Sequence, residues 1–159
     1  MAYQNLGTEL AAQNRLDEAI DAYEGALRAR PDYAAARNNL VLAHIKRADA
    51  AAERPERVDE AIAHYEAVLR IEPDHFRAHY NLGTLLMDIP ERHAEALAHL
   101  ESAVNIQPDS AEARVNLGVL LADVPSRSAE AIEHLEFALA KRPDLVRLRE
   151  LIDEVKKRP

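Results

Sequence analysis

Four asparagines in one recurring local setting are the residues of this chain best suited to recognise another molecule. They stand at Asn5, Asn39, Asn81 and Asn116, each directly before a leucine. An asparagine side chain carries a carbonyl acceptor and an amide donor, which together complement a backbone peptide unit. Such a series at repeat spacing could pair with the backbone of an extended peptide whatever its sequence. The alternative is that these side chains bond neighbouring helices or water, and both interpretations stay open.

Histidine is the second residue type with potential chemistry. His64, His99 and His134 share one position in successive segments, while His75 and His79 are four residues apart. Packed helices lie about 8–10 Å apart, whereas a Zn–N bond is about 2 Å long, so the first three cannot readily share one ion. The motifs His-Glu-x-x-His and Gly-x-Ser-x-Gly and a glycine-rich phosphate loop are absent from the sequence. The sequence therefore predicts no catalytic residue, no metal site and no cofactor.

These residues belong to a repeated pattern. Four prolines, each followed by Asp, stand at Pro31, Pro73, Pro108 and Pro143, with spacings of 42, 35 and 35 residues. A Glu-Ala-(Ile or Leu) step precedes each proline, and an Asn-Leu step precedes that. Apolar residues recur with helical spacing around both steps, as in Leu82, Leu85 and Leu86. Each repeat is therefore a pair of helices, and the pairs must stack because none can bury its apolar stripe alone.

The repeated motif resembles the tetratricopeptide repeat over residues 2–145. The first repeat reads Tyr3-x2-Leu6-Gly7-x2-Leu10, followed by Ala19-x3-Tyr23 and Pro31. The resemblance implies an all-α, right-handed solenoid of antiparallel helix pairs. We expect repeats at residues 1–33, 34–75, 76–110 and 111–145, then a capping helix at 146–159, together forming one solenoid domain. Gly7, Gly83 and Gly118 are expected where the two helices of a pair approach closely; Val41 stands there in the second repeat and predicts a wider pair.

In this family the first helix of each repeat lines a concave groove that binds a peptide or protein segment. The resemblance thus implies a non-enzymatic protein–protein interaction scaffold. The expected groove residues, beside the four asparagines, are Gln4, Asn38, Arg77, Tyr80, Thr84, Met87, Val115 and Val119. A clamp for a chaperone's C-terminal carboxylate is disfavoured, because only Asn39 and Arg77 fit that motif.

The second repeat is seven residues longer than the third and fourth between its Asn-Leu and Glu-Ala steps. We expect the additional residues within Arg47–Glu53, which contains no helix breaker. Seven residues are two helical turns and nearly preserve the phase of a helix. The sequence therefore predicts one long helix over residues 34–53 with a projecting end. That end is either a docking spur or a tolerated insertion, and the insertion is the favoured interpretation.

Composition narrows the class of partner. Twenty Lys and Arg against 28 Asp and Glu give a net charge of −8, a poor match to nucleic acid.

The sequence has neither a signal peptide nor an apolar run long enough to insert into a membrane, so a cytoplasmic protein is expected, or a periplasmic or extracytoplasmic domain of a longer chain. Because the first repeat has no polar cap, a homo-oligomer through that repeat is possible. The alternatives to a scaffold are the substrate-recognition domain of a larger enzyme, such as a glycosyltransferase, and a self-assembling structural unit.

Overall fold

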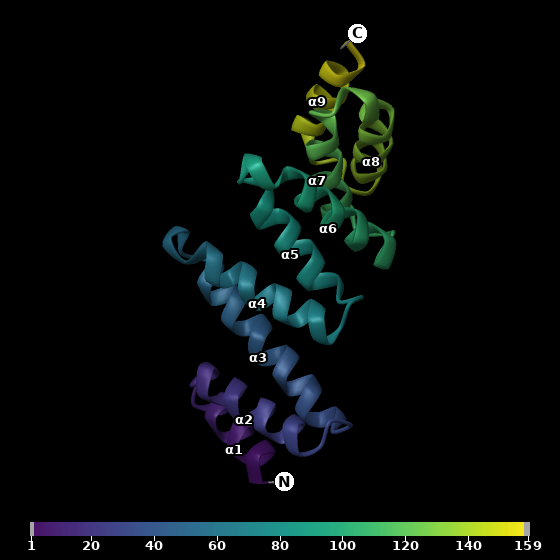
Figure 1. The fold of residues 1–159 in the computed structure, drawn as a ribbon. Helices are drawn as coiled ribbons and strands as arrows, with labels where there is room; N and C mark the ends of the chain where they lie inside the picture. Colours follow the sequence, from purple (N-terminus) through teal and green to yellow (C-terminus); the bar gives the residue numbers. More distant parts are fainter. Residues whose placement is uncertain (1, 158–159) are drawn as a thin grey trace. The chain divides into compact units, whose positions relative to one another are not determined.

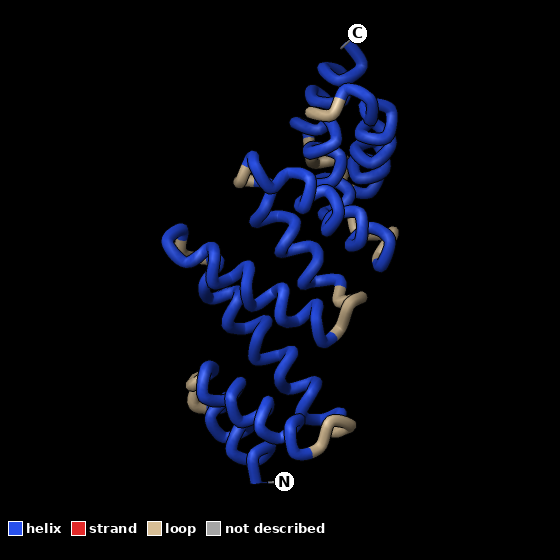
Figure 2. Tube along the Cα trace, viewed as in Figure 1, coloured by secondary structure: helices blue, strands red, loops and turns tan. Residues whose placement is uncertain are grey.

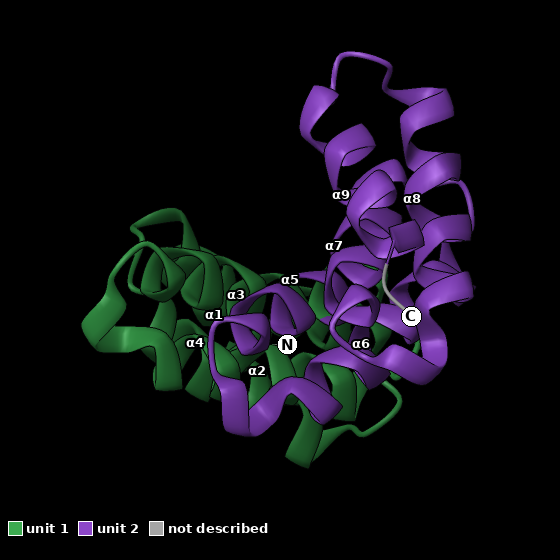
Figure 3. Cartoon of the chain, turned by 90° about the horizontal axis from the view of Figure 1, so that it is seen from above, with its two compact units in different colours: residues 1–78 green, residues 79–159 purple. Residues whose placement is uncertain are grey.

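The computed structural model describes residues 2–157, and every regular element in that range is a helix (Figure 2). The chain divides into two compact units, unit 1 at residues 1–78 and unit 2 at residues 79–159 (Figure 3). The all-α prediction is therefore confirmed for the described part of the chain.

The helices follow one another in pairs (Figure 1). Unit 1 contains α1 (Ala2–Ala12), α2 (Leu16–Ala29), α3 (Ala34–Ala52), the 3-10 helix η1 (Pro55–Arg57), α4 (Val58–Ile71) and the first turn of α5 (Phe76–Met87). Unit 2 contains the rest of α5, η2 (Pro90–Arg92), α6 (His93–Ile106), α7 (Ala111–Ala122), η3 (Pro125–Arg127), α8 (Ser128–Lys141) and α9 (Val146–Lys157). Helices α1 and α2, α3 and α4, and α7 and α8 pack against each other as pairs.

Proline and arginine mark where the second helix of each pair begins. Pro55, Pro90 and Pro125 open the short 3-10 helices, where a missing N–H costs no hydrogen bond. At the first residues of all four second helices an arginine binds the glutamate three residues later, and the pairs are Arg15–Glu18, Arg57–Glu60, Arg92–Glu95 and Arg127–Glu130. A glutamate in the first turn also complements the helix dipole. This repeated ion pair was visible in the sequence as Arg-x-x-Glu but was not singled out there.

Two glycines allow the helices of unit 2 to approach closely, as expected. A Cβ atom at Gly118 would lie 2.7 Å from Leu135 Cγ and 3.2 Å from the carbonyl oxygen of Ala131. At Gly83 it would lie 2.8 Å from Leu100 Cγ. Both distances are shorter than ordinary packing contacts, so a larger residue would push the helices apart.

Each unit has its own apolar core. In unit 1, Leu10 of α1, Ile20 and Tyr23 of α2, and Leu40 and Ala43 of α3 form one buried cluster. In unit 2, Leu135 and Ala138 of α8 pack with Leu148 and Ile152 of α9 and with Ala111 of α7. Helix α9 thus covers the last pair with its apolar face, while its charged residues stay exposed.

Helix α3 has 19 residues, against 11 or 12 in α1, α5 and α7. The predicted position of its additional turns, however, is wrong. Ala48 and Ala51 are fully buried, and Arg47 is ion-paired, so Arg47–Glu53 does not project into solvent.

The contacts with the second helices show where the additional turns lie. In three pairs a side chain of the first helix meets a side chain 20 residues later: His44 with His64, His79 with His99, and Arg114 with His134. From His44 onward, α3 therefore keeps the 35-residue spacing of the later repeats. Ala48, not Val41, takes the register position of Gly83 and Gly118, so Val41 is not the residue that sets the spacing of this pair. The additional two turns lie between Leu40, which belongs to the core shared with α2, and Ala48, and within them Ala43 belongs to the same core while His44 contacts α4.

Candidate functional site

In unit 1, the first helices α1 and α3 border a small pocket of about 160 Å³. Asn39 lines it from α3, and Thr8 lines it from α1. The exposed side chain of Leu42 and the ammonium group of Lys46 stand at the same pocket. Of the two asparagines of this unit that precede a leucine, Asn39 is half-buried at the pocket and Asn5 is exposed.

Two further predicted residues of unit 1 lie differently. Gln4 is buried, and its Oε1 atom has no hydrogen-bond partner among the described residues. Asn38 is exposed. Gln4 therefore offers little surface to a bound peptide.

Arg77, the last predicted residue of unit 1, forms an ion pair with Asp49 of the same unit. Its Nη2 atom donates to Asp49 Oδ2 at 2.5 Å, and the hydroxyl of Tyr65 donates to Asp49 Oδ1 at 2.6 Å. The carboxylate of Asp49 thus joins α3 to α4 and to the start of α5. A ligand that required the Arg77 guanidinium would have to compete with Asp49.

In unit 2, α5 and α7 border a pocket of about 200 Å³, here called the α5–α7 pocket. Its lining is mostly apolar and consists of Tyr80, Ala111, Glu112, Val115, Asn116, Arg142 and Leu145. Three of these residues, Tyr80, Val115 and Asn116, were predicted from the sequence. Arg142 and Glu112 lie 3.6 Å apart at this pocket and form an exposed ion pair.

A chain of hydrogen bonds joins α7 to α5 beside this pocket. The amide of Asn116 donates through Nδ2 to Thr84 Oγ1 at 2.9 Å, and the Thr84 hydroxyl donates to the carbonyl oxygen of Tyr80 at 2.8 Å. One of the two N–H groups of the Asn116 amide is therefore bound to a neighbouring helix. The second N–H group and the carbonyl oxygen are the groups with which Asn116 can serve a ligand. Asn81, the other predicted asparagine of unit 2, is half-buried.

The remaining predicted residues of unit 2 are partly used in packing. Val115 and Val119 are half-buried against the cluster that includes Leu148 and Ile152 of α9. Met87 is half-buried, and its carbonyl oxygen accepts a hydrogen bond from His93 Nε2 at 2.9 Å. The apolar character of these positions thus serves the stacking of helices as well as the pocket.

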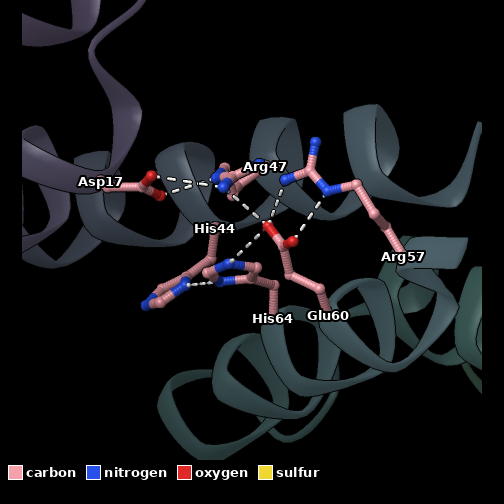
Figure 4. Close-up of polar contacts among 6 residues, drawn as sticks. All are labelled: Asp17, His44, Arg47, Arg57, Glu60 and His64. Carbon is pink, nitrogen blue, oxygen red and sulfur yellow. Dashed lines mark hydrogen bonds and ion pairs between the residues drawn. The ribbon is translucent and has the colours of Figure 1, made fainter. Parts of the chain in front are cut away.

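A polar network in unit 1 was not foreseen (Figure 4). Arg47 of α3 lies between Asp17 of α2, at 2.6 Å, and Glu60 of α4, at 2.7 Å. Arg57 binds both oxygens of Glu60, at 2.9 and 2.7 Å. The hydrogen bond from Arg47 lowers the pKa of Asp17, and the one from Arg57 lowers the pKa of Glu60, so both carboxylates stay ionised near neutral pH.

The same network reaches a pair of histidines. His64 Nε2 lies 3.9 Å from Glu60 Oε1, and its Nδ1 lies 2.9 Å from His44 Nδ1 (Figure 4). Burial, with a smaller contribution from His64, lowers the pKa of His44 to about 4. Burial and the charge of Arg47 also lower the pKa of His64. Both rings are therefore neutral near pH 7. The 20-residue separation of paired histidines was the signal that could have revealed this contact.

An open, charged notch of about 810 Å³ adjoins this network. The α1–α2 turn forms one side and the second half of α3 the other, with lining residues Asn14, Arg15, Leu16, Asp17, Glu18, Lys46, Arg47, Asp49, Ala50, Glu53 and Arg57. Seven residues span about 10 Å along a helix, so the contact of α3 with α4 is displaced from its contact with α2 by that distance. The notch follows from this displacement.

None of the helices within residues 2–157 is long and apolar enough to cross a membrane. Nor do three or more His, Cys, Asp or Glu side chains of the described residues gather where they could hold a metal ion.

The sequence and the fold were compared with those of known proteins. The family model for the tetratricopeptide repeat matches residues 7–46 and 56–88. A comparison with curated protein sequences found no match. Among solved structures, the chain is similar to YrrB, which is described as a TPR protein with an unusual peptide-binding site. The TM-score is 0.64 at 24% sequence identity, and the likeness covers 98% of this chain and 75% of YrrB.

Two further solved structures have a similar fold. A MamA protein gives a TM-score of 0.61 at 23% identity, covering 97% of this chain and 79% of that one. The first TPR of Spaghetti (RPAP3), bound to the HSP90 peptide SRMEEVD, gives 0.65 at 16% identity, covering 74% of this chain and 90% of that one. These likenesses confirm the all-α solenoid fold class. The family match thus identifies tetratricopeptide repeats within residues 7–46 and 56–88, and the fold of the described chain is similar to that of solved proteins built from this repeat.

Proposed function

We propose that the chain is a non-enzymatic scaffold whose unit 2 binds an extended segment of a partner protein in the α5–α7 pocket. The observation that carries the proposal is the convergence of Tyr80, Val115 and Asn116 on this pocket. Tyrosine is enriched among residues that dominate binding energy, and an apolar pocket with a polar edge suits one anchoring side chain.

The chemistry of the lining defines the segment that fits. Val115, Leu145 and the ring of Tyr80 receive an apolar side chain. The bond from Nδ2 to Thr84 fixes the Asn116 side chain, and its carbonyl oxygen accepts a backbone N–H of the same segment. The Arg142–Glu112 pair at the edge suits polar residues beside the anchor. Two similar folds add support, since YrrB is described as having a peptide-binding site and the RPAP3 repeat domain holds a peptide.

The test begins with a random peptide library selected on the full chain. Selected peptides are then titrated by fluorescence anisotropy against the unaltered chain and against Tyr80→Ala. We expect the variant to weaken binding by about 10-fold or more, which corresponds to about 1.4 kcal/mol. Asn5→Ala is the matched control, because Asn5 is an exposed asparagine outside the pocket, and it should leave binding unchanged. Equal affinity for Tyr80→Ala and the unaltered chain would refute the assignment of the pocket.

A second function, self-assembly through the first repeat, is supported by one observation. Leu6 is 48% exposed, whereas Leu82 and Leu117, which follow the landmark asparagine in the same way, are 0% and 1% exposed. Tyr3, on the same helix, is also exposed. We propose a second copy of this chain as the occupant of that surface. Light scattering across concentration tests this, and Leu6→Glu should hold the chain as a monomer where the unaltered chain dimerises. A monomer at every concentration would exclude the proposal.

A further inference from the structure

A stripe of exposed side chains runs along α3 from its middle to its end. Leu42, Lys46, Ala50 and Glu53 follow one another at intervals of four, four and three residues, so they share one face of the helix. Leu42 keeps 52% of its surface exposed although its side chain is large and apolar. Within the described part of unit 1, this face of α3 is therefore left uncovered by the other helices.

The stripe connects two hollows of unit 1. Leu42 lines the pocket of about 160 Å³ between α1 and α3, whereas Ala50 and Glu53 line the notch of about 810 Å³. Leu16 and Lys46 line both, so the pocket and the notch form one continuous groove along α3, here called the α3 groove. The pocket is smaller than the roughly 300–1,000 Å³ sites that hold whole small molecules, and it suits a single side chain of a longer ligand.

The charged side chains of the α3 groove are of two kinds. Arg15, Arg47 and Arg57 are each bound to a carboxylate of unit 1. Lys46 and Glu53, by contrast, form no ion pair with the other residues that the structure describes. They are seven residues apart, which is about 10 Å along a helix. The groove therefore offers a ligand an ammonium group and, two turns further on, a carboxylate.

Register sets Lys46 apart from the residues at the same position elsewhere. The side-chain contacts between residues 20 positions apart place Lys46 where the third and fourth repeats have Asn81 and Asn116. Both Leu42 and Lys46 lie within the two additional turns of the second repeat. This repeat thus has an ammonium group in place of a neutral amide, with an exposed leucine one turn before it. A ligand of the α3 groove should therefore carry a negative charge next to an apolar side chain.

We propose that the α3 groove binds an extended segment of a partner protein, with an apolar side chain beside Leu42, an acidic side chain on Lys46 and a basic side chain on Glu53. Leu42 and Lys46 are about 6 Å apart along the helix, close to the roughly 6.7 Å between alternate residues of an extended chain. The acidic residue of the segment thus lies two positions from the apolar one. The distance from Lys46 to Glu53 places the basic residue about two to four positions further on.

The experiment selects a random peptide library on the full chain and, in parallel, on Lys46→Glu. Peptides retained by the unaltered chain but not by the variant should contain an acidic residue beside an apolar one. Fluorescence anisotropy then measures the affinity of a retained peptide. Lys46→Asn, which gives this position the side chain of the later repeats, should weaken binding by about 5-fold. Lys157→Asn is the matched control, because Lys157 is an exposed lysine of α9 outside the groove, and it should leave the affinity unchanged.

Exchange of the two charges distinguishes a direct contact from an indirect effect of Lys46. Replacing the acidic residue of the peptide by lysine should abolish binding to the unaltered chain and restore binding to Lys46→Glu. A purely structural role of Lys46 does not produce this rescue. Added salt should weaken the original pair, since both charges lie at an exposed surface. Leu42→Ala should also weaken binding, because the apolar side chain of the peptide loses its contact.

Two results would overturn the proposal. One is a selection that yields no peptide able to distinguish the unaltered chain from Lys46→Glu, and the other is a charge exchange that restores no affinity. Circular dichroism checks the fold of each variant, and Lys46→Asn measures the same contact should Lys46→Glu unfold. Tyr80→Ala keeps this outcome separate from that of the α5–α7 pocket, because a peptide in the α3 groove should bind that variant with unchanged affinity.

Discussion

The first helices of the second and fourth repeats, α3 and α7, each pack on the preceding helix and on the following helix, but they do so in different ways. In α7 one stretch of helix packs on both α6 and α8, and Leu117 and Gly118 stand side by side in it. In α3 the equivalent positions are seven residues further apart, because Leu40 belongs to the core with α1 and α2 whereas the buried Ala48 takes the register position of Gly118. The contact of a first helix with the preceding helix and its contact with the following helix can therefore lie at different positions along it. An insertion of two turns leaves both contacts on the same face of the helix and changes the distance between them.

The sharpest way to break this comparison is a pair of deletions of equal length in α3. Removal of residues 41–47 joins Leu40 to Ala48 and restores the order of Leu117 and Gly118, so the repeat should fold with ordinary spacing. Removal of residues 47–53 instead places Val41 at the close approach to α4 and His44 at the buried position of Ala51. We expect the first variant to keep cooperative thermal unfolding, measured by circular dichroism, and the second to lose it. The reverse result would mean that the seven additional residues of α3 are Arg47–Glu53, as predicted from the sequence.

Acid should destabilise unit 1 through the protonation of His44. Its folded-state pKa of about 4 is below the unfolded value of 6.5, so the unfolded chain binds the additional proton as pH falls between these values. Stability is therefore full above pH 6.5 and declines as pH falls toward 4. The loss attributable to His44 is at most about 3 kcal/mol.

Urea denaturation at pH 7 and pH 4.5 measures that loss, and His44→Gln is the variant to compare. The variant should show a smaller decrease than the unaltered chain. Burial also lowers the pKa of His134 in unit 2, so part of the pH dependence should persist in the variant. An unchanged pH dependence in His44→Gln would contradict the assigned role of burial.

Two glycine substitutions compare a tightly packed glycine with a loosely packed one. Gly118→Ala in unit 2 brings a Cβ to 2.7 Å from Leu135 Cγ and to 3.2 Å from a backbone oxygen, and overpacking of this kind costs about 1–3 kcal/mol. Gly25→Ala in unit 1 meets only the exposed ring of Tyr3, at 3.2 Å. Alanine is favoured over glycine in a helix by about 1 kcal/mol. In urea denaturation we expect Gly118→Ala to destabilise and Gly25→Ala to be neutral or stabilising; equal losses would mean that α7 and α8 are not in tight contact.

Repeat landmarks predict the helix pairs well, because each landmark marks a local event, such as a proline at a turn or a small residue at a close approach. Gly83 and Gly118 illustrate this, since both meet the helix expected from the motif. The position of the insertion could not be read in the same way. A run such as Ala48 to Ala52 suits both a buried face and a solvated end, and only the contact with α4 distinguishes them. Likewise, the composition of the motif does not show that Asn116 donates to Thr84 rather than to a ligand, because both uses require the same side chain.

The smallest expected effect comes from Arg47, which stands where register places Leu82 and Leu117 in the later repeats. In those repeats the leucine is buried, whereas Arg47 binds Asp17 and Glu60 at the edge of the notch. Arg47→Leu removes the ion pairs and places an apolar side chain against the exposed carboxylate of Asp17. We expect a small loss in urea denaturation, because Arg47 and Glu60 are only partly buried and Asp17 is exposed, so that solvent weakens both pairs, and we expect a smaller loss at high salt. An increase in the stability of unit 1 on Arg47→Leu would contradict this expectation. It would mean that residue 47 faces an apolar surface, as Leu82 and Leu117 do, and that the additional residues displace α4 along α3 by less than two turns.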